Sequence, residues 1–117
     1  MNDQMGLFFA DAGEAAKEAA IEAVGRNAEP SWLDAAWTAL LAACKDAWAL
    51  QEGLVSDDVW MRLYSAGVPA PHDPRAMGAV MRRAVKADLL LPTSVFRPSD
   101  LPQNHRRPVR VYTVRHG

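Results

Sequence analysis

Four basic side chains recur between residues 75 and 86, and no acidic residue stands between them: Arg75, Arg82, Arg83 and Lys86. Guanidinium and ammonium groups donate hydrogen bonds to phosphate oxygens and to base edges. Small residues, Gly78 and Ala79, lie among these cations and would let another backbone approach closely. The pattern predicts a helix face that enters the major groove of duplex DNA. A solvated basic helix face is the alternative.

A second basic group follows near the C-terminus, in and around the Pro-rich stretch 98–108. It consists of Arg97, His105, Arg106, Arg107 and Arg110. An exposed loop of this composition predicts contacts to the phosphate backbone or the minor groove. The alternative is a solvated hairpin tip whose charges only protect the strand edges.

The remaining polar residues lack the spacing that catalytic and metal sites require. His72, His105 and His116 are not paired as ligands with one another or with Cys44. The seven glycines are scattered, so no phosphate-cradling loop is present, and the serines have no neighbouring base. We therefore expect no enzymatic activity, cofactor or metal. Cys44 falls on an apolar helical stripe, which predicts a buried small hydrophobic residue.

The net charge of -1 conceals a strong asymmetry along the chain. Residues 1–60 contain eleven acidic and three basic side chains, whereas residues 61–117 contain three acidic and ten basic ones. The net charges of the two parts are therefore -8 and +7. Such asymmetry suggests different partners for the two parts, with nucleic acid the expected partner of the basic part.

The length of 117 residues suits a single domain, residues 31–117, preceded by an extension, residues 1–30, with an Ala-rich helix over 11–24. No apolar run approaches the roughly 18 residues that span a bilayer. The N-terminus also lacks the basic start and cleavage site of a signal peptide. These features predict a cytoplasmic protein.

The elements that would position the cations follow from caps and periodicity. A helix is expected from Ser31 to about Gln51, ended by Gly53, and another over 56–65, with Ser56 as N-cap and Gly67 as a left-handed stop. Acidic residues 57 and 58 suit the positive end of that helix. The basic helix is expected over 73–90, and β-branched alternation predicts strands at 93–97 and 109–115. The order predicts a mainly α fold with a small β-hairpin, a winged helix-turn-helix.

The helix over 31–51 has two apolar faces. The wider face, expected in the core, consists of Leu33, Trp37, Leu40, Leu41, Cys44 and Trp48. The shallower face consists of Trp32, Ala36, Ala39, Ala43 and Ala47 and could accept another helix closely. That helix could come from residues 11–24 or from a second subunit. We expect a homodimer built mainly from residues 7–50.

The stretch from Trp32 to Tyr112 resembles small winged helix-turn-helix proteins of actinobacterial phages and prophages. The residues that carry the resemblance are 56–60 (SDDVW), 74–82 (PRAMGAVMR) and 104–112 (NHRRPVRVY). The resemblance implies a DNA-binding protein of an infected cell, and residues 1–30 fall outside it.

Together these observations predict non-enzymatic binding of double-stranded DNA, regulatory or in phage DNA metabolism. The alternative is a protein-interaction module, in which the acidic N-terminal helices contact a host or phage protein, because fold alone does not determine function.

Overall fold

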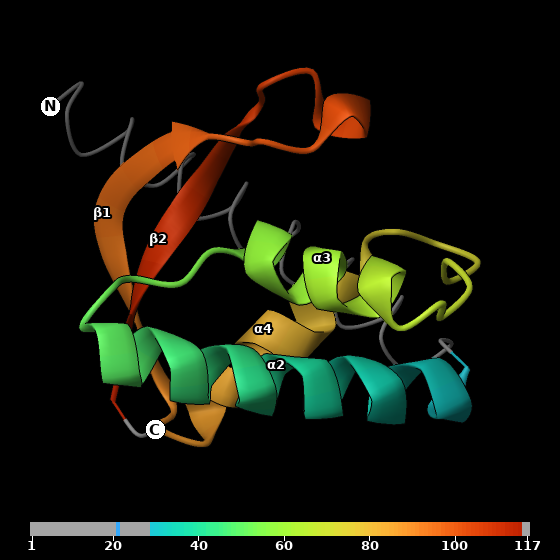
Figure 1. Cartoon of the computed structure of the whole chain (residues 1–117), viewed down its shortest axis with the longest axis horizontal. Helices are drawn as coiled ribbons and strands as arrows, with labels where there is room; N and C mark the ends of the chain where they lie inside the picture. Colours follow the sequence, from blue (N-terminus) through green and yellow to red (C-terminus); the bar gives the residue numbers. More distant parts are fainter. Residues whose placement is uncertain (1–20, 22–28, 116–117) are drawn as a thin grey trace, which may run out of the picture.

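The computed structural model describes Ile21 and residues 29–115. These residues form three helices and an antiparallel hairpin (Figure 1). In chain order the elements are α2 (Pro30–Leu50), α3 (Ser56–Ser65), α4 (Ala76–Lys86), β1 (Leu90–Pro98), the short 3-10 helix η1 (Pro102–Asn104) and β2 (Pro108–Val114). The prediction of helices followed by a small hairpin is confirmed. The helix predicted over 11–24 lies outside the described residues, apart from the helical Ile21.

The three helices pack together, and the hairpin rises beside them (Figure 1). α2 and α3 lie side by side, and α4 lies behind them. The base of the hairpin lies beside the C-terminal end of α2, and the loop between its strands bends back over α3. No helix in the described ranges is long and apolar enough to cross a membrane.

The core-facing side of α2 is the shallow alanine face. Ala36, Ala43 and Ala47 are buried together with Trp32 and Leu40 in the core shared with α3 and α4. The prediction that the wider face lies in the core is therefore wrong at two large residues, because Leu41 is 41% and Trp48 is 54% exposed. Small side chains on α2 let the other helices pack closely, which offsets the smaller apolar area of each alanine.

The alanine face is thus covered by other residues of the same chain, and no partner subunit is needed to bury it. The homodimer through residues 7–50 stays a prediction, and the expected burial of Cys44 in this core is confirmed.

The ends of α2 differ from the expected ones. The helix begins at Pro30 with Glu29 as N-cap, so Ser31 does not cap it, and it ends at the left-handed residue Gln51, with φ 56°. Gly53 has a different role, because a Cβ there would lie 2.6 Å from Val111 Cγ1. Strand β2 passes so close that only glycine fits without a shift.

α3 starts and stops largely as expected. Its N-cap is Val55 instead of Ser56, and the Asp58 carboxylate accepts a 2.9 Å hydrogen bond from the Val55 N–H. The left-handed stop at Gly67 is confirmed, with φ 73°. A residue with a Cβ would be strained there.

α4 is shorter than the predicted helix over 73–90. Its N-cap is Arg75, and no side chain accepts a capping hydrogen bond there. The Asp73 carboxylate accepts a 2.9 Å hydrogen bond from the Arg75 N–H within the turn of residues 73–75 that precedes the helix. At the other end Asp88 has φ 61°, and Leu90 already belongs to β1. The left-handed residue turns the chain from the helix into the hairpin.

The hairpin strands pair from Leu90 opposite Val114 to Pro98 opposite Pro108, with an irregularity between Pro92 and Phe96. β1 is therefore longer than the expected strand at 93–97. On its other side β2 pairs with Leu54, through two 2.8 Å backbone hydrogen bonds between Leu54 and Tyr112. The hairpin is thereby joined to the segment that links α2 to α3.

The far end of the hairpin is held by a buried carboxylate. Asp57 is 4% exposed, and its carboxylate accepts hydrogen bonds from the Ser99 hydroxyl (2.9 Å) and from the Asp100 N–H (2.8 Å). The Ser99 hydroxyl in turn accepts hydrogen bonds from the Leu101 N–H and the Asn104 side chain. The loop 98–108 was expected to be exposed, and this is wrong for its first part, where Ser99 and Leu101 are buried.

Replacing Asp57 should therefore destabilise the fold more than replacing its neighbour. Asp57→Ala leaves buried donors of the hairpin loop without an acceptor, which should cost about 2 to 3 kcal/mol of unfolding free energy. Asp58→Ala removes only a helix cap and should cost about 1 kcal/mol. Urea denaturation of both variants measures the difference, and an Asp58→Ala cost equal to or larger than that of Asp57→Ala would contradict this role.

Candidate nucleic-acid interface

The four cations predicted on one helix face lie in different environments. Arg75 precedes α4 and pairs with Asp73, with 2.7 Å between Nη2 and Oδ2. Arg83 reaches to the α2 side, where its Cζ lies 3.9 Å from the centroid of the Trp37 ring. Arg82 faces the hairpin side, and Lys86 is exposed in the last turn of α4. The basic residues therefore surround α4 instead of forming one flat face.

Arg75 and Asp73 influence each other's titration. Hydrogen bonds from Arg75 lower the pKa of the Asp73 carboxyl, and the same side-chain pairing raises the pKa of the Arg75 guanidinium. Arg75 is exposed and Asp73 is half-buried. The charge of Arg75 is thus largely balanced by Asp73.

A groove of about 620 Å³ lies between α4 and β2, and we call it the α4–β2 groove. Arg82 of α4 and both Arg110 and Tyr112 of β2 line it. The remaining lining residues from these elements and their neighbours are mainly apolar: Trp60, Met77, Met81, Val85, Pro92 and Val109. Two guanidinium groups from distant parts of the sequence thus share one concave site. A groove of this kind suits an anionic group that presents oxygen acceptors.

The titration of Tyr112, which is half-buried, reflects the electrostatics of the α4–β2 groove. Burial raises the pKa of its phenol, and the positive charges of Arg110 and Arg82 partly oppose the increase. Both arginines therefore lie close enough to Tyr112 to influence its charge. Sequence reasoning missed Tyr112, because an alternating strand does not reveal which side chain faces the helix.

The group that lies close to Gly78 is a side chain of the same chain, Ile21. A Cβ on Gly78 would lie 3.1 Å from Ile21 Cγ2, and Ile21 also lines the α4–β2 groove. A duplex that contacted α4 at Gly78 would therefore have to displace the Ile21 side chain.

The cations of the hairpin fall into two groups. Arg110 lies over the Phe96 ring, 4.7 Å from its centroid, and donates a hydrogen bond to the Thr93 carbonyl. The second group consists of Arg97 in β1, and His105, Arg106 and Arg107 at the loop, and these residues are exposed, as Arg110 is. His105 and Arg106 have left-handed backbones, with φ 48° and 59°. The cations at the loop are therefore presented by a tight turn anchored through Asp57.

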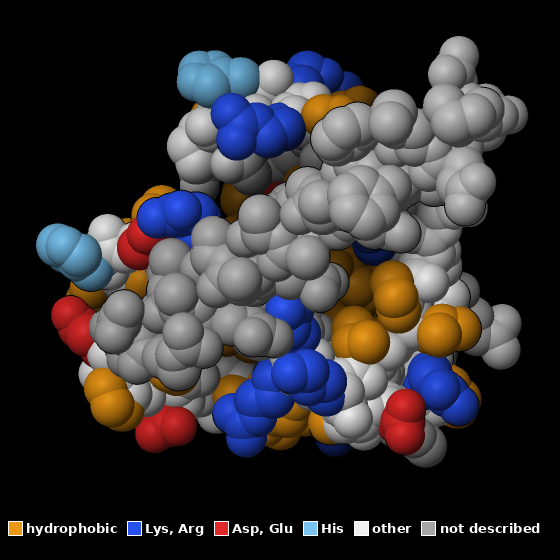
Figure 2. Space-filling model, turned by 180° about the vertical axis from the view of Figure 1, so that it is seen from behind, with side chains coloured by type: hydrophobic (Ala, Val, Ile, Leu, Met, Phe, Trp, Pro, Cys, Tyr) orange, Lys and Arg blue, Asp and Glu red, His pale blue; other side chains and the backbone are white. Residues whose placement is uncertain are grey.

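The face that carries α4 is rich in positive charge. Figure 2 shows Lys and Arg side chains at the lower centre and near the top of this view, whereas Asp and Glu side chains lie mostly at its margins. Among the described residues no group of three or more His, Cys, Asp and Glu side chains could hold a metal ion. Burial raises the pKa of the Cys44 thiol, which disfavours the reactive thiolate.

The position of Tyr112 can be tested by titration. The folded state disfavours the phenolate, so the unfolding free energy should fall as pH rises above the unfolded pKa of about 10. Tyr112→Phe should reduce that decrease. Phenolate absorbance should show a higher Tyr112 pKa in Arg110→Ala, because one of the opposing positive charges is removed; an unchanged titration would place Arg110 away from the phenol.

Comparison with protein-family models, curated proteins and solved structures finds no match to this chain. The resemblance to winged helix-turn-helix proteins of actinobacterial phages therefore rests on its sequence motifs alone, and the family assignment stays a prediction.

Proposed function

We propose that the protein binds double-stranded DNA without catalysing a reaction, with the hairpin acting as the wing of a winged helix-turn-helix. In this proposal α4 and the hairpin approach one duplex together. The setting is the cytoplasm of a bacterium that carries the phage genome, where the protein regulates transcription or takes part in phage DNA metabolism.

The observation that carries the proposal is the shared placement of Arg82 and Arg110 in the α4–β2 groove. A phosphate at this groove would accept hydrogen bonds from a helix residue and a strand residue at once, which fixes the orientation of both elements on the backbone. The apolar walls reduce the competition from water and so strengthen these charge-assisted bonds.

The exposed cations of the hairpin loop supply a second point of contact. Arg106 and Arg107 lie on a loop that Asp57 and Ser99 hold against α3, so the loop loses little conformational freedom on binding. Contacts from such a loop to phosphate oxygens stabilise any duplex, irrespective of its sequence. Base discrimination would then depend on α4 through Arg83, which lies on the Trp37 ring.

The α4–β2 groove is tested by removing its cations singly. Arg82→Ala and Arg110→Ala should each weaken binding to duplex DNA by roughly 1 to 3 kcal/mol. Arg62→Ala is the matched control, because it removes the same charge from α3 at a residue that does not line this groove. Fluorescence anisotropy with a labelled duplex measures the three affinities. Equal weakening in all three variants would mean that only net charge matters, and the groove would have no special role.

The hairpin loop is tested by the dependence of binding on salt. Arg106→Ala and Arg107→Ala should weaken specific and random duplexes alike and lower the slope of log K against log salt by about one unit for each arginine replaced, because each neutralises one phosphate. Arg83→Ala should instead reduce the difference between a preferred site and random DNA. The series runs from about 50 mM to about 200 mM salt. Weak wild-type binding that no variant changes would exclude duplex DNA as the ligand.

A protein partner is the second candidate function, and one observation favours it independently. Large apolar side chains of α2 and α3 are exposed: Leu50, Met61 and Trp48 are each more than half exposed. Interfaces are enriched in Met and aromatic residues relative to the rest of the surface.

A further inference from the structure

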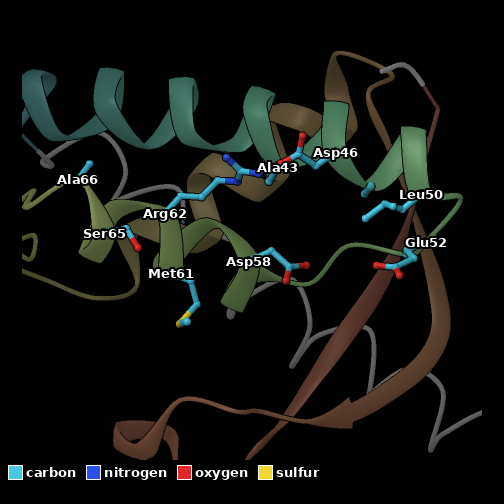
Figure 3. Close-up of a pocket in the computed structure, with 11 residues that line it drawn as sticks. Ala43, Asp46, Leu50, Glu52, Asp58, Met61, Arg62, Ser65 and Ala66 are labelled. Carbon is cyan, nitrogen blue, oxygen red and sulfur yellow. Dashed lines mark hydrogen bonds and ion pairs between the residues drawn. The ribbon is translucent and has the colours of Figure 1, made fainter.

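A second groove lies between α2 and α3, with a volume of about 730 Å³, and we call it the α2–α3 groove (Figure 3). Its floor includes Ala43 and Ala47, which are 3% and 9% exposed. Two apolar side chains from its margins remain in contact with solvent, since Leu50 is 65% and Met61 is 55% exposed. The groove thus offers apolar surface of both helices to a binding partner.

Acidic side chains surround this apolar surface. Asp46 comes from α2, Asp58 from α3, and Glu52 from the segment between them. The single cation of the lining, Arg62, reaches across the groove and pairs with Asp46 (Figure 3). The carboxylates of Glu52 and Asp58 point toward each other at the other end of the groove, and none of the described residues places a cation on the Glu52 carboxylate. The groove therefore has a net negative charge beside exposed apolar groups.

The surface continues past Glu52 to Trp48. A hollow of about 500 Å³ on that side is lined by Trp48, Glu52 and Gly53, so it shares residues with the α2–α3 groove. Trp48 is 54% exposed. An exposed tryptophan beside a carboxylate suits a side chain that carries both an apolar part and a positive charge, such as Lys or Arg.

We infer that the α2–α3 groove, together with Trp48, is a docking site for a basic amphipathic segment of another protein. Apolar side chains of the segment lie on Leu50, Met61 and the alanine floor, and its Lys or Arg residues face Glu52 and Asp58. Charge complementarity selects this partner. Nucleic acid does not suit the groove, because its phosphates would face carboxylates.

Residues of the same chain are poorer candidates for the groove. Residues 1–28 contain five acidic and two basic side chains, so they lack the complementary charge. The basic loop of a second copy carries Arg106 and Arg107 beside prolines and has no large aliphatic side chain between residues 102 and 108. It would therefore meet the carboxylates but leave the apolar surface exposed.

The probe is a synthetic helical peptide of about 15 residues, with Leu at helical spacing and Lys elsewhere. We expect micromolar binding to the wild-type protein, measured by anisotropy of the labelled peptide. Glu52→Lys and Leu50→Ser should each weaken it roughly tenfold. The matched controls, Asp34→Lys and Leu41→Ser, change an exposed acid and an exposed leucine elsewhere on α2 and should leave the affinity within about twofold.

Two altered peptides separate the components of the proposed site. A peptide with Glu in place of Lys should not bind, and one with Gln in place of Leu should bind much more weakly. Equal binding of the Gln peptide would reduce the site to charge attraction and overturn the inference. The inference would also be overturned if the Leu and Lys peptide did not bind detectably, or if the control variants weakened its binding as much as Glu52→Lys and Leu50→Ser do.

Self-association and DNA binding are measured alongside. Sedimentation shows whether the wild-type protein forms a dimer. A dimer that both Glu52→Lys and Arg106→Ala abolish would assign the groove to a second copy and overturn the assignment to another protein. Duplex DNA affinity should not fall in Leu50→Ser, since the two grooves involve different residues. Failure of DNA binding would therefore leave the peptide result interpretable, and failure of peptide binding would leave the DNA result interpretable.

Discussion

The buried carboxylate of Asp57 is the constraint on which the arrangement of helices and hairpin depends. At its base the hairpin is joined to the helical layer by the backbone bonds of Leu54, and at its far end the buried hydrogen bonds are those that Ser99 and Asp100 make with Asp57. A carboxylate that is 4% exposed must be surrounded by donors, since a buried charge without them is strongly unfavourable. The start of α3 favours negative charge as well, because unpaired N–H groups point toward it. Asp57 thus holds the basic loop against α3, and a hydrogen bond that the Gln103 side chain donates to the Tyr64 hydroxyl joins the same two elements at the surface.

The two grooves of the molecule carry opposite charges. The α4–β2 groove contains Arg82 and Arg110, and the α2–α3 groove contains Glu52 and Asp58. The opposite charges of the two halves of the sequence thus become two sites in the folded chain. A protein built this way could hold DNA on one side and a basic protein segment on the other, because neither ligand competes electrostatically for the other's site.

The sequence predicted the elements far better than their contacts. Helix stops depend on near neighbours, so Gly67 could be identified directly. The role of Asp57 could not be identified, because its partner Ser99 is 42 residues away in the sequence. Its position at a helix start was also sufficient to account for an acidic residue. The core face of α2 was predicted only in part, since Leu40 and Cys44 are buried but Leu41 and Trp48 are exposed. Large side chains suggested burial, whereas close packing with α3 and α4 selected the alanines and left Trp48 exposed.

The cations of α4 show why a basic helix pattern alone does not define a reading surface. A charge that already interacts within the chain must exchange that interaction for one with DNA, and only the difference contributes to binding. Arg75 would have to leave Asp73, an exposed pair that contributes little and is easily exchanged. Arg83 can keep its position, because a guanidinium stacked on Trp37 still has N–H groups at its edge for an acceptor. The stacked arginine is pre-oriented and would give up less side-chain entropy on binding, so in the proposed complex the Trp37 ring of α2 would contribute to recognition without touching the nucleic acid.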